Sequence, residues 1–221
     1  MRIDFHSHIL PKIDDGSSSS QESIEMLTRA NEQGVKILCL TPHFYPEDEN
    51  PDSFIKRRDA AFNRLITVCE EQGFTGPRLF RGAEVAWFTS IGKSEEVKKL
   101  CLGNTNIILV EMPFAPWNNM MIESLVSLKE ELDLQPVLAH IDRYFPFVRR
   151  ETLNYLVFEK GIWLQVNAES INNPAICEMI KNNMISFVGS DAHNTTTRPV
   201  NIGDAYDVLE EKGLLDKLRT L

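Results

Sequence analysis

The stretch Asn106-Ile107-Ile108-Leu109-Val110-Glu111 places four consecutive apolar residues directly before an acidic one. A strand with one solvated face alternates apolar and polar residues, whereas an unbroken apolar run is typical of a strand buried on both faces. Val35, Ile37 and Leu38 form a second apolar stretch of this kind. Strands buried on both faces occur in parallel sheets that are covered by helices, so these runs predict an α/β protein.

Seven β-rich runs alternate with helix-like segments along the whole chain. The runs cover residues 2–5, 36–40, 78–83, 106–110, 136–139, 162–166 and 185–189. The helix-like segments cover residues 21–33, 52–72, 120–132, 151–160, 175–182 and 204–212. This alternation predicts a parallel sheet, and the lack of a dinucleotide-binding fingerprint favours a barrel over an open sheet. Because no linker interrupts the 221 residues, we expect a single domain over residues 1–221.

The composition limits the partners and the compartment. A formal net charge of −9 argues against a nucleic-acid partner, which would require a basic surface. No segment approaches the roughly 18 apolar residues of a membrane span, and the first residues lack the apolar core of a signal peptide. The four cysteines form no CxxC pair and begin no Cys-x5-Arg phosphatase loop. We therefore expect reduced thiols in a cytoplasmic protein without membrane insertion.

The five histidines occur in short motifs rather than scattered along helix faces. The motifs are Asp4-Phe5-His6-Ser7-His8, Thr41-Pro42-His43, Ala139-His140-Ile141-Asp142-Arg143 and Ser190-Asp191-Ala192-His193. Imidazole together with carboxylate is the usual ligand set for Zn, Mn and Fe(II). The histidine motifs therefore predict a metalloenzyme.

The candidate metal ligands fall at one end of the predicted strands. His6, His8, His43, Glu84, Glu111, His140, Asp191 and His193 lie at or just after C-terminal strand ends, where barrel active sites are built. Asp15 lies on the loop after the first strand and can reach the same rim, although the adjacent Asp14 could replace it. Nine ligands exceed the four to six that one ion takes, so they imply two or three ions.

The order of these motifs resembles the PHP (polymerase and histidinol phosphatase) superfamily. The motifs resemble most closely those of the CpsB/YwqE-type bacterial metal-dependent protein tyrosine phosphatases, from Asp4 to about Arg198. The resemblance implies a distorted (β/α)7 TIM-like barrel with a trinuclear metal site, with Mn as the first expectation and Fe or Zn as alternatives. It assigns His6, His8, Glu84 and Asp191 to one ion, Glu84, Glu111 and His140 to a second, and Asp15, His43 and His193 to a third.

The same resemblance implies hydrolysis of a phosphate monoester. Metal-bound water ionises near neutral pH, so a hydroxide can attack the phosphate without a protein base. Arg143 and Arg198 can each bind phosphate oxygens, and we expect these two arginines and Asp191 to form the catalytic set. The segment after His140 reads Ile-Asp-Arg-Tyr, where a Pro-Glu-Arg-like sequence is expected, but Arg143 keeps its place.

The resemblance also suggests a substrate. It implies phosphotyrosine in a protein, with a bacterial tyrosine kinase that controls capsule or exopolysaccharide synthesis as the typical partner. Phe44, Tyr45, Phe114 and Trp117 lie in the longer loops and could flank a phosphotyrosine ring. The alternatives are a small-molecule phosphatase of the histidinol-phosphate type, a metal-dependent amidohydrolase and a non-catalytic metal-binding regulator. The amidohydrolase is disfavoured because no lysine ends a predicted strand.

Overall fold

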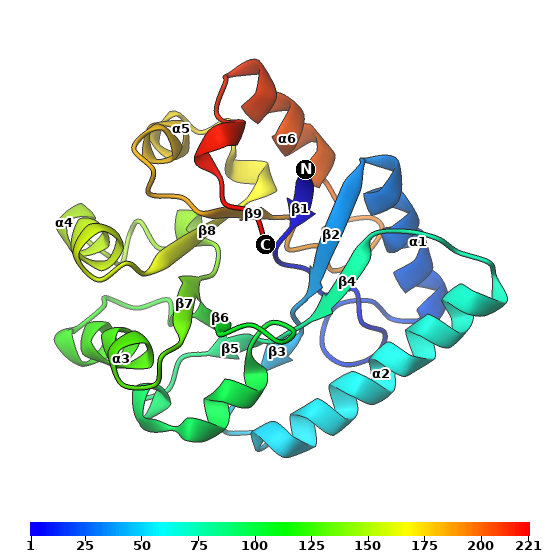
Figure 1. Ribbon diagram of the computed structural model, residues 1–221, viewed down its shortest axis with the longest axis horizontal. Coiled ribbons are helices and arrows are strands. Elements are labelled where there is room, and N and C mark those ends of the chain that lie inside the picture. Colours follow the sequence, from blue (N-terminus) through cyan, green and yellow to red (C-terminus); the bar gives the residue numbers. More distant parts are fainter.

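Short parallel strands form the centre of the structure, and the helices lie around their outside in chain order (Figure 1). The computed structural model describes residues 1–221. The strands are β1 (Arg2–Asp4), β2 (Val35–Leu40), β3 (His43–Phe44), β4 (Arg78–Arg81), β5 (Glu84–Ala86), β6 (Ile107–Glu111), β7 (Gln135–Leu138), β8 (Trp163–Asn167) and β9 (Phe187–Gly189). The α-helices are α1 (Ser20–Glu32), α2 (Pro51–Glu71), α3 (Asn119–Glu130), α4 (Arg150–Asn154), α5 (Pro174–Lys181) and α6 (Ile202–Glu211).

Every run predicted to be a strand contains one, and all strand pairs are parallel, so the α/β class and the parallel sheet are confirmed. The strand count differs from seven because two strand positions are divided. Pro42, which has no N–H, separates β2 from β3, and Gly82-Ala83 separates β4 from β5. The result is a three-stranded sheet, β1-β2-β4, and a six-stranded sheet, β3-β5-β6-β7-β8-β9.

Backbone hydrogen bonds bring the first and last strands together. Phe5 N–H donates to the carbonyl of Val188 over 3.2 Å, Asp191 N–H to that of His6 over 2.8 Å, and His8 N–H to that of Ala192 over 2.8 Å. The sheet is therefore curled, and the segments that follow β1 and β9 lie side by side. This contact places the motifs around His6 and Asp191 next to one another.

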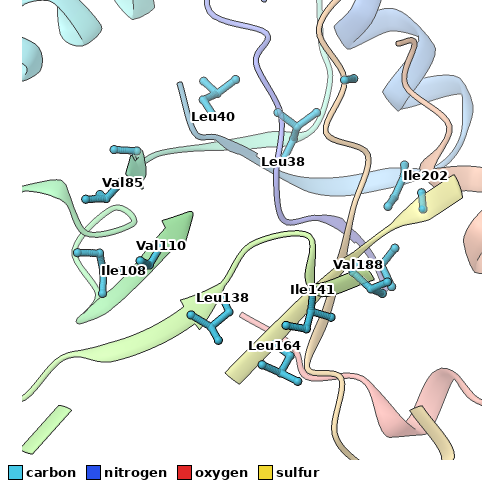
Figure 2. Close-up of a cluster of buried hydrophobic side chains, with 14 of the residues drawn as sticks. Leu38, Leu40, Val85, Ile108, Val110, Leu138, Ile141, Leu164, Val188 and Ile202 are labelled. Atoms are coloured by element: carbon cyan, nitrogen blue, oxygen red, sulfur yellow. The ribbon is translucent and has the colours of Figure 1, made fainter. Parts of the chain in front are cut away.

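The strands have apolar residues on both faces. Leu38, Leu40, Ile108, Val110 and Leu138 belong to the large cluster of 52 buried residues that includes the inner faces of the helices (Figure 2). The residues between them along the strands, Cys39, Leu109 and Val137, belong to a separate cluster with Phe5 and Phe187, whose rings stack at 4.0 Å. This alternation explains why residues 107–110 are uniformly apolar.

Helix starts and breaks follow local chemistry. The side chains of Ser19, Asn50 and Asn173 accept backbone N–H groups at the starts of α1, α2 and α5, as N-cap residues do. The segment predicted as one helix over residues 151–160 is a short α4 that continues as a π-helical turn, η4 (Tyr155–Glu159). None of the helices has the length and hydropathy needed to cross a membrane.

Candidate metal centre

All nine residues predicted as metal ligands come together at one rim of the sheet, where β1, β6, β7 and β9 end and the short strands β3 and β5 begin. Their centre is Glu84, the first residue of β5, whose side chain is 1% exposed. Its Oε2 lies 3.2 Å from His6 Nε2, 3.3 Å from His8 Nε2 and 3.0 Å from His43 Nδ1. Its Oε1 accepts a hydrogen bond from His140 Nε2 over 2.9 Å. One buried carboxylate thus faces four imidazoles from three segments, since His6 and His8 belong to the same one.

The remaining carboxylates lie around this centre. Glu111, at the end of β6, has its Oε1 3.5 Å from His140 Nε2 and its Oε2 3.8 Å from His43 Nδ1. Asp15 Oδ1 lies 3.5 Å from His43 Nε2 and 3.4 Å from His193 Nε2. Every residue of the cluster is therefore linked to the others through contacts between nitrogen and oxygen atoms shorter than 4 Å.

The cluster fits divalent cations. Buried atoms without a hydrogen-bond partner include His43 Nδ1, Glu84 Oε2, His140 Nδ1 and His193 Nε2. Burying polar atoms unpaired is costly, and a cation among them would remove that cost. Three groups have ligand atoms within 4.8 Å of one another: His8, Asp15, His43 and His193; His6, His8 and Asp191; and His43, Glu84 and Glu111. Imidazole and carboxylate ligands suit Mn, Fe and Zn.

The two adjacent aspartates that the sequence left open have different surroundings. Asp14 Oδ2 accepts from His8 Nδ1 over 2.7 Å and from the N–H of His43 over 3.0 Å, so Asp14 lies behind these histidines. Asp15 has a 65% exposed side chain and faces His43 and His193. The geometry places Asp15, and not Asp14, among the candidate ligands. Asp14 instead holds the ring of His8 with its Nε2 toward Glu84.

Asp191 uses its two oxygens differently. Oδ2 accepts hydrogen bonds from Nη2 of Arg143 and Nη2 of Arg198, each over 2.7 Å, and from Nδ2 of Asn167 over 3.1 Å. Oδ1 lies 3.7 Å from His6 Nε2 and 3.5 Å from His8 Nε2. Burial alone would raise the pKa of this carboxyl, but the neighbouring histidines and Arg143 hold the pKa well below its usual range. Asp191 is therefore an anion with one oxygen toward the histidines.

Two of the candidate ligands have an uncommon backbone conformation. His140 has φ 30° two residues after β7, and Asp191 has φ 52° two residues after β9. Residues other than glycine rarely adopt this left-handed region, and the strain is kept where the surroundings enforce it, often at functional sites. Both residues turn the chain at a strand end, which directs their side chains into the cluster.

The sequence reasoning did not identify the polar residues that support the cluster. Asp142, where the sequence departs from the expected motif, accepts from the N–H of Asn167 over 3.0 Å and from the hydroxyl of Ser170 over 2.8 Å. It ties the turn after His140 to the end of β8. Gln165 and Asn167 are buried amides on β8. The sequence pattern that could have indicated them is the placement of polar residues at alternate positions in Trp163-Leu164-Gln165-Val166-Asn167, a strand whose other residues are apolar.

The four aromatic residues predicted to flank a substrate differ in their exposure. Phe44 is 1% exposed and cannot contact a substrate, and Trp117 packs against Tyr144 with ring centroids 5.4 Å apart. Tyr45 is 38% exposed and stacks on His43 at 5.2 Å. Phe114 is 53% exposed and stacks on His140 at 6.2 Å. Tyr45 and Phe114 are thus the two exposed members of this set and lie beside the cluster, whereas Trp117 is partly buried.

A curled parallel sheet with imidazoles and carboxylates gathered at its C-terminal strand ends defines a class of α/β proteins built for metal-dependent chemistry. The chain belongs to the CpsB/CapC family of capsular polysaccharide synthesis proteins, whose family model matches residues 2–221.

The chain is similar to known proteins over most of their length. The tyrosine-protein phosphatase YwqE of Bacillus subtilis is 31% identical over 229 residues, with 95% of this chain and 84% of that protein covered. A chain from the crystal structures of YwqE and of CpsB from Streptococcus pneumoniae, described as unique metal-dependent tyrosine phosphatases, superposes with a TM-score of 0.78 at 28% identity, covering 99% of this chain and 96% of that one. A putative histidinol phosphatase from Listeria monocytogenes shares the fold, with a TM-score of 0.53 at 13% identity over 87% of this chain and 95% of that one.

Metal binding should release protons. Burial alone would lower the pKa of His8, but the bond to Asp14 and the contact with Glu84 raise it to about 10, and Glu111 and Glu84 likewise raise that of His140 to about 9. Both imidazoles are protonated below those values, and a metal needs the neutral ring, so affinity should increase as the pH rises from 6 to 8. Calorimetric Mn²⁺ titrations in buffers of different ionisation enthalpy should show about two protons released at pH 7. Mn²⁺ binding to the His8→Ala variant should release about one proton fewer than binding to the wild-type protein. Mn²⁺ binding to the wild-type protein without net proton release would contradict the prediction.

Proposed function

We propose that this chain is a metal-dependent protein tyrosine phosphatase that binds two or three divalent ions, with Mn preferred over Fe or Zn. The observation that carries the proposal is the buried Glu84, surrounded by imidazoles and carboxylates, beside two arginines that converge on Asp191. The names of the relatives as metal-dependent tyrosine phosphatases support it. The nine ligands are His6, His8, Asp15, His43, Glu84, Glu111, His140, Asp191 and His193.

The proposed fold and location follow the same family. The backbone hydrogen bonds between the segments of β1 and β9, and the two divided strand positions, support a distorted (β/α)7 barrel. The match of the family model over residues 2–221 supports one domain. Four buried, unpaired cysteines suit a reducing compartment, so we place the protein in the cytoplasm.

Bound divalent ions supply Lewis acidity and a water that ionises near neutral pH. The residues of the chain set the charge of the site and limit its exposure to water. Asp15, Glu84, Glu111 and Asp191 do not neutralise three divalent ions, so the site stays attractive to a phosphate. The buried His6 and His8 keep bulk water away from the centre, since both side chains are 0% exposed.

Arg143 and Arg198 are placed to hold the phosphate. Each donates one guanidinium N–H to Asp191 Oδ2, and their side chains are 33% and 39% exposed. The remaining N–H groups of each fork are free to bind phosphate oxygens as charge builds up on them. The bond to Asp191 fixes the position of both guanidinium groups before substrate arrives, which reduces the entropy lost on binding.

We further propose phosphotyrosine in a protein as the substrate, with a bacterial tyrosine kinase that controls capsule or exopolysaccharide synthesis as the partner. Tyr45 and Phe114 support an aryl phosphate, because both present accessible rings next to candidate ligands. A small-molecule phosphatase of the histidinol-phosphate type is the second candidate, since such an enzyme shares the fold.

Removal of one ligand should abolish turnover but not folding. His6→Ala takes one imidazole from the centre while the apolar clusters remain intact. We expect kcat/KM for p-nitrophenyl phosphate to fall by more than about 100-fold and metal content to fall by about one ion per chain. Elemental analysis and circular dichroism measure the two effects. Wild-type protein with one metal or none under Mn-replete conditions would refute the multinuclear site.

The arginine assignment predicts that charge alone is insufficient. Arg143→Ala and Arg198→Ala should each lower kcat/KM by about 10- to 100-fold. Arg143→Lys and Arg198→Lys keep the charge but lose the planar guanidinium group, so neither lysine variant should restore the lost kcat/KM. Arg150→Ala is the matched control, because Arg150 forms an exposed ion pair with Glu178 on the outer helices. Wild-type kcat/KM in both Arg143→Ala and Arg198→Ala, with metal content unchanged, would rule out phosphate binding by these residues.

The substrate assignment predicts faster hydrolysis of phosphotyrosyl peptides than of phosphoseryl peptides or histidinol phosphate. Tyr45→Ala and Phe114→Ala should lower kcat/KM for the phosphotyrosyl peptide by about 2- to 10-fold through loss of ring contacts. The control is Phe158→Ala, which removes an exposed ring on η4. Chelators should inhibit, and thiol alkylation should not, since all four cysteines are buried. A higher kcat/KM for histidinol phosphate than for every phosphotyrosyl peptide would favour the second candidate.

A further inference from the structure

Strand β8 brings two buried amides up to the candidate metal centre. Gln165 is 0% exposed and Asn167 is 1% exposed, and their side chains lie on the same side of the strand because they are two residues apart. Neither side chain belongs to the nine candidate ligands. Together they connect His6 and His140 with Asp191, the residue to which the two arginines bind.

The two amides form a hydrogen-bonded chain. Gln165 Oε1 accepts the backbone N–H of His140 over 2.7 Å, and Gln165 Nε2 donates to Asn167 Oδ1 over 3.1 Å. Asn167 Nδ2 then donates to Asp191 Oδ2 over 3.1 Å. A backbone N–H can only donate, and an ionised carboxylate can only accept. The two ends therefore fix the direction of every hydrogen bond between them.

This direction has a consequence for His6. Its Nδ1 lies 3.3 Å from Gln165 Oε1, which is an acceptor, so Nδ1 carries the proton and donates. The other ring nitrogen, Nε2, is then left with its lone pair toward Glu84 Oε2 and Asp191 Oδ1. At the other end, Asn167 occupies Asp191 Oδ2 together with the two arginines, which leaves Oδ1 for the centre.

We propose that Gln165 and Asn167 are positioning residues that select the metal-binding nitrogen of His6 and the metal-binding oxygen of Asp191. The inference rests on the proposed metal site and adds residues that do not themselves touch an ion. Outer hydrogen-bond partners of this kind orient ligands and are worth about 10- to 100-fold in metal affinity.

Packing is close around the Gln165 amide, and a glycine on the next strand makes room for it. A Cβ added at Gly189, on the adjacent strand β9, would lie 2.6 Å from His6 Cβ and 3.0 Å from Gln165 Nε2. The absence of a side chain at Gly189 therefore allows His6 and Gln165 to approach this strand closely. The Gln165 bond to His140 also supports a backbone held at φ 30°.

The test uses the full chain and Mn²⁺ alone as the probe. Gln165→Met and Asn167→Leu keep the approximate volume of each side chain and remove its hydrogen bonds. We expect each to weaken Mn²⁺ binding by about 10-fold or more in calorimetric titrations. Because the amides act as one chain, the double variant should weaken binding no more than the worse single variant, a coupling that separate contacts would not show.

The matched control is Gln135→Met. Gln135 is also a buried, hydrogen-bonded glutamine, but it begins β7, at the end of the sheet opposite to the centre. Its replacement should lower the melting temperature of the metal-free protein and leave Mn²⁺ affinity unchanged. The metal-free melting temperatures of all variants separate a loss of stability from a loss of metal affinity.

Each outcome is decisive. Weaker Mn²⁺ binding in the β8 variants, with unchanged binding in Gln135→Met, supports the positioning role. Unchanged Mn²⁺ affinity in the β8 variants, equal losses in all three variants, or failure of the β8 variants to fold would overturn it in favour of a structural role. Wild-type protein that binds no Mn²⁺ would instead refute the proposed function itself.

Discussion

The burial of the Glu84 carboxylate among imidazoles is the constraint on which the rest of the centre depends. A carboxylate that is 1% exposed requires compensating charge or hydrogen bonds, and here these come from His6, His8, His43 and His140. Burial alone would raise the pKa of Glu84, but the surrounding histidines lower it well below its usual range. The four histidines come from segments near β1, β3 and β7, which the curled sheet brings to a common rim.

A common device orients three of the five histidines of the cluster, His6, His8 and His193. One ring nitrogen is held by an acceptor outside the centre, and the other is left to face inward. Asp14 holds Nδ1 of His8, and Gln165 lies against Nδ1 of His6. The backbone carbonyl of Asp191 holds Nδ1 of His193 over 2.9 Å. Three different acceptors thus produce the same result, an Nε2 directed into the cluster, because a neutral imidazole has one donor and one acceptor nitrogen.

The apolar core and the polar centre are separate along each strand. Leu109 packs inside the curled sheet, and Glu111, two residues further, reaches the cluster from the same strand. Phe5 and Phe187 stack in the same inner layer, just before the segments that carry His6 and Asp191. The core therefore fixes the strand ends without involving the candidate ligands, so a ligand can be exchanged without removing any apolar contact.

The sequence by itself determined the class of fold and, apart from the choice between Asp14 and Asp15, the residues that gather at the strand ends. Apolar runs such as residues 107–110 indicate a strand buried on both faces. Histidines and acidic residues at the ends of several strands indicate that these side chains meet at one edge of the sheet. Both patterns can be read from the sequence because they depend only on spacing along the chain. The tertiary structure alone decided the position of Asp15 rather than Asp14 in the cluster and the burial of Phe44 beside an exposed Tyr45. It alone also revealed the bonds from Gln165 and Asn167 to ligand segments on other strands. These features depend on which atom of a side chain faces which neighbour, and the neighbours come from strands far away in the sequence.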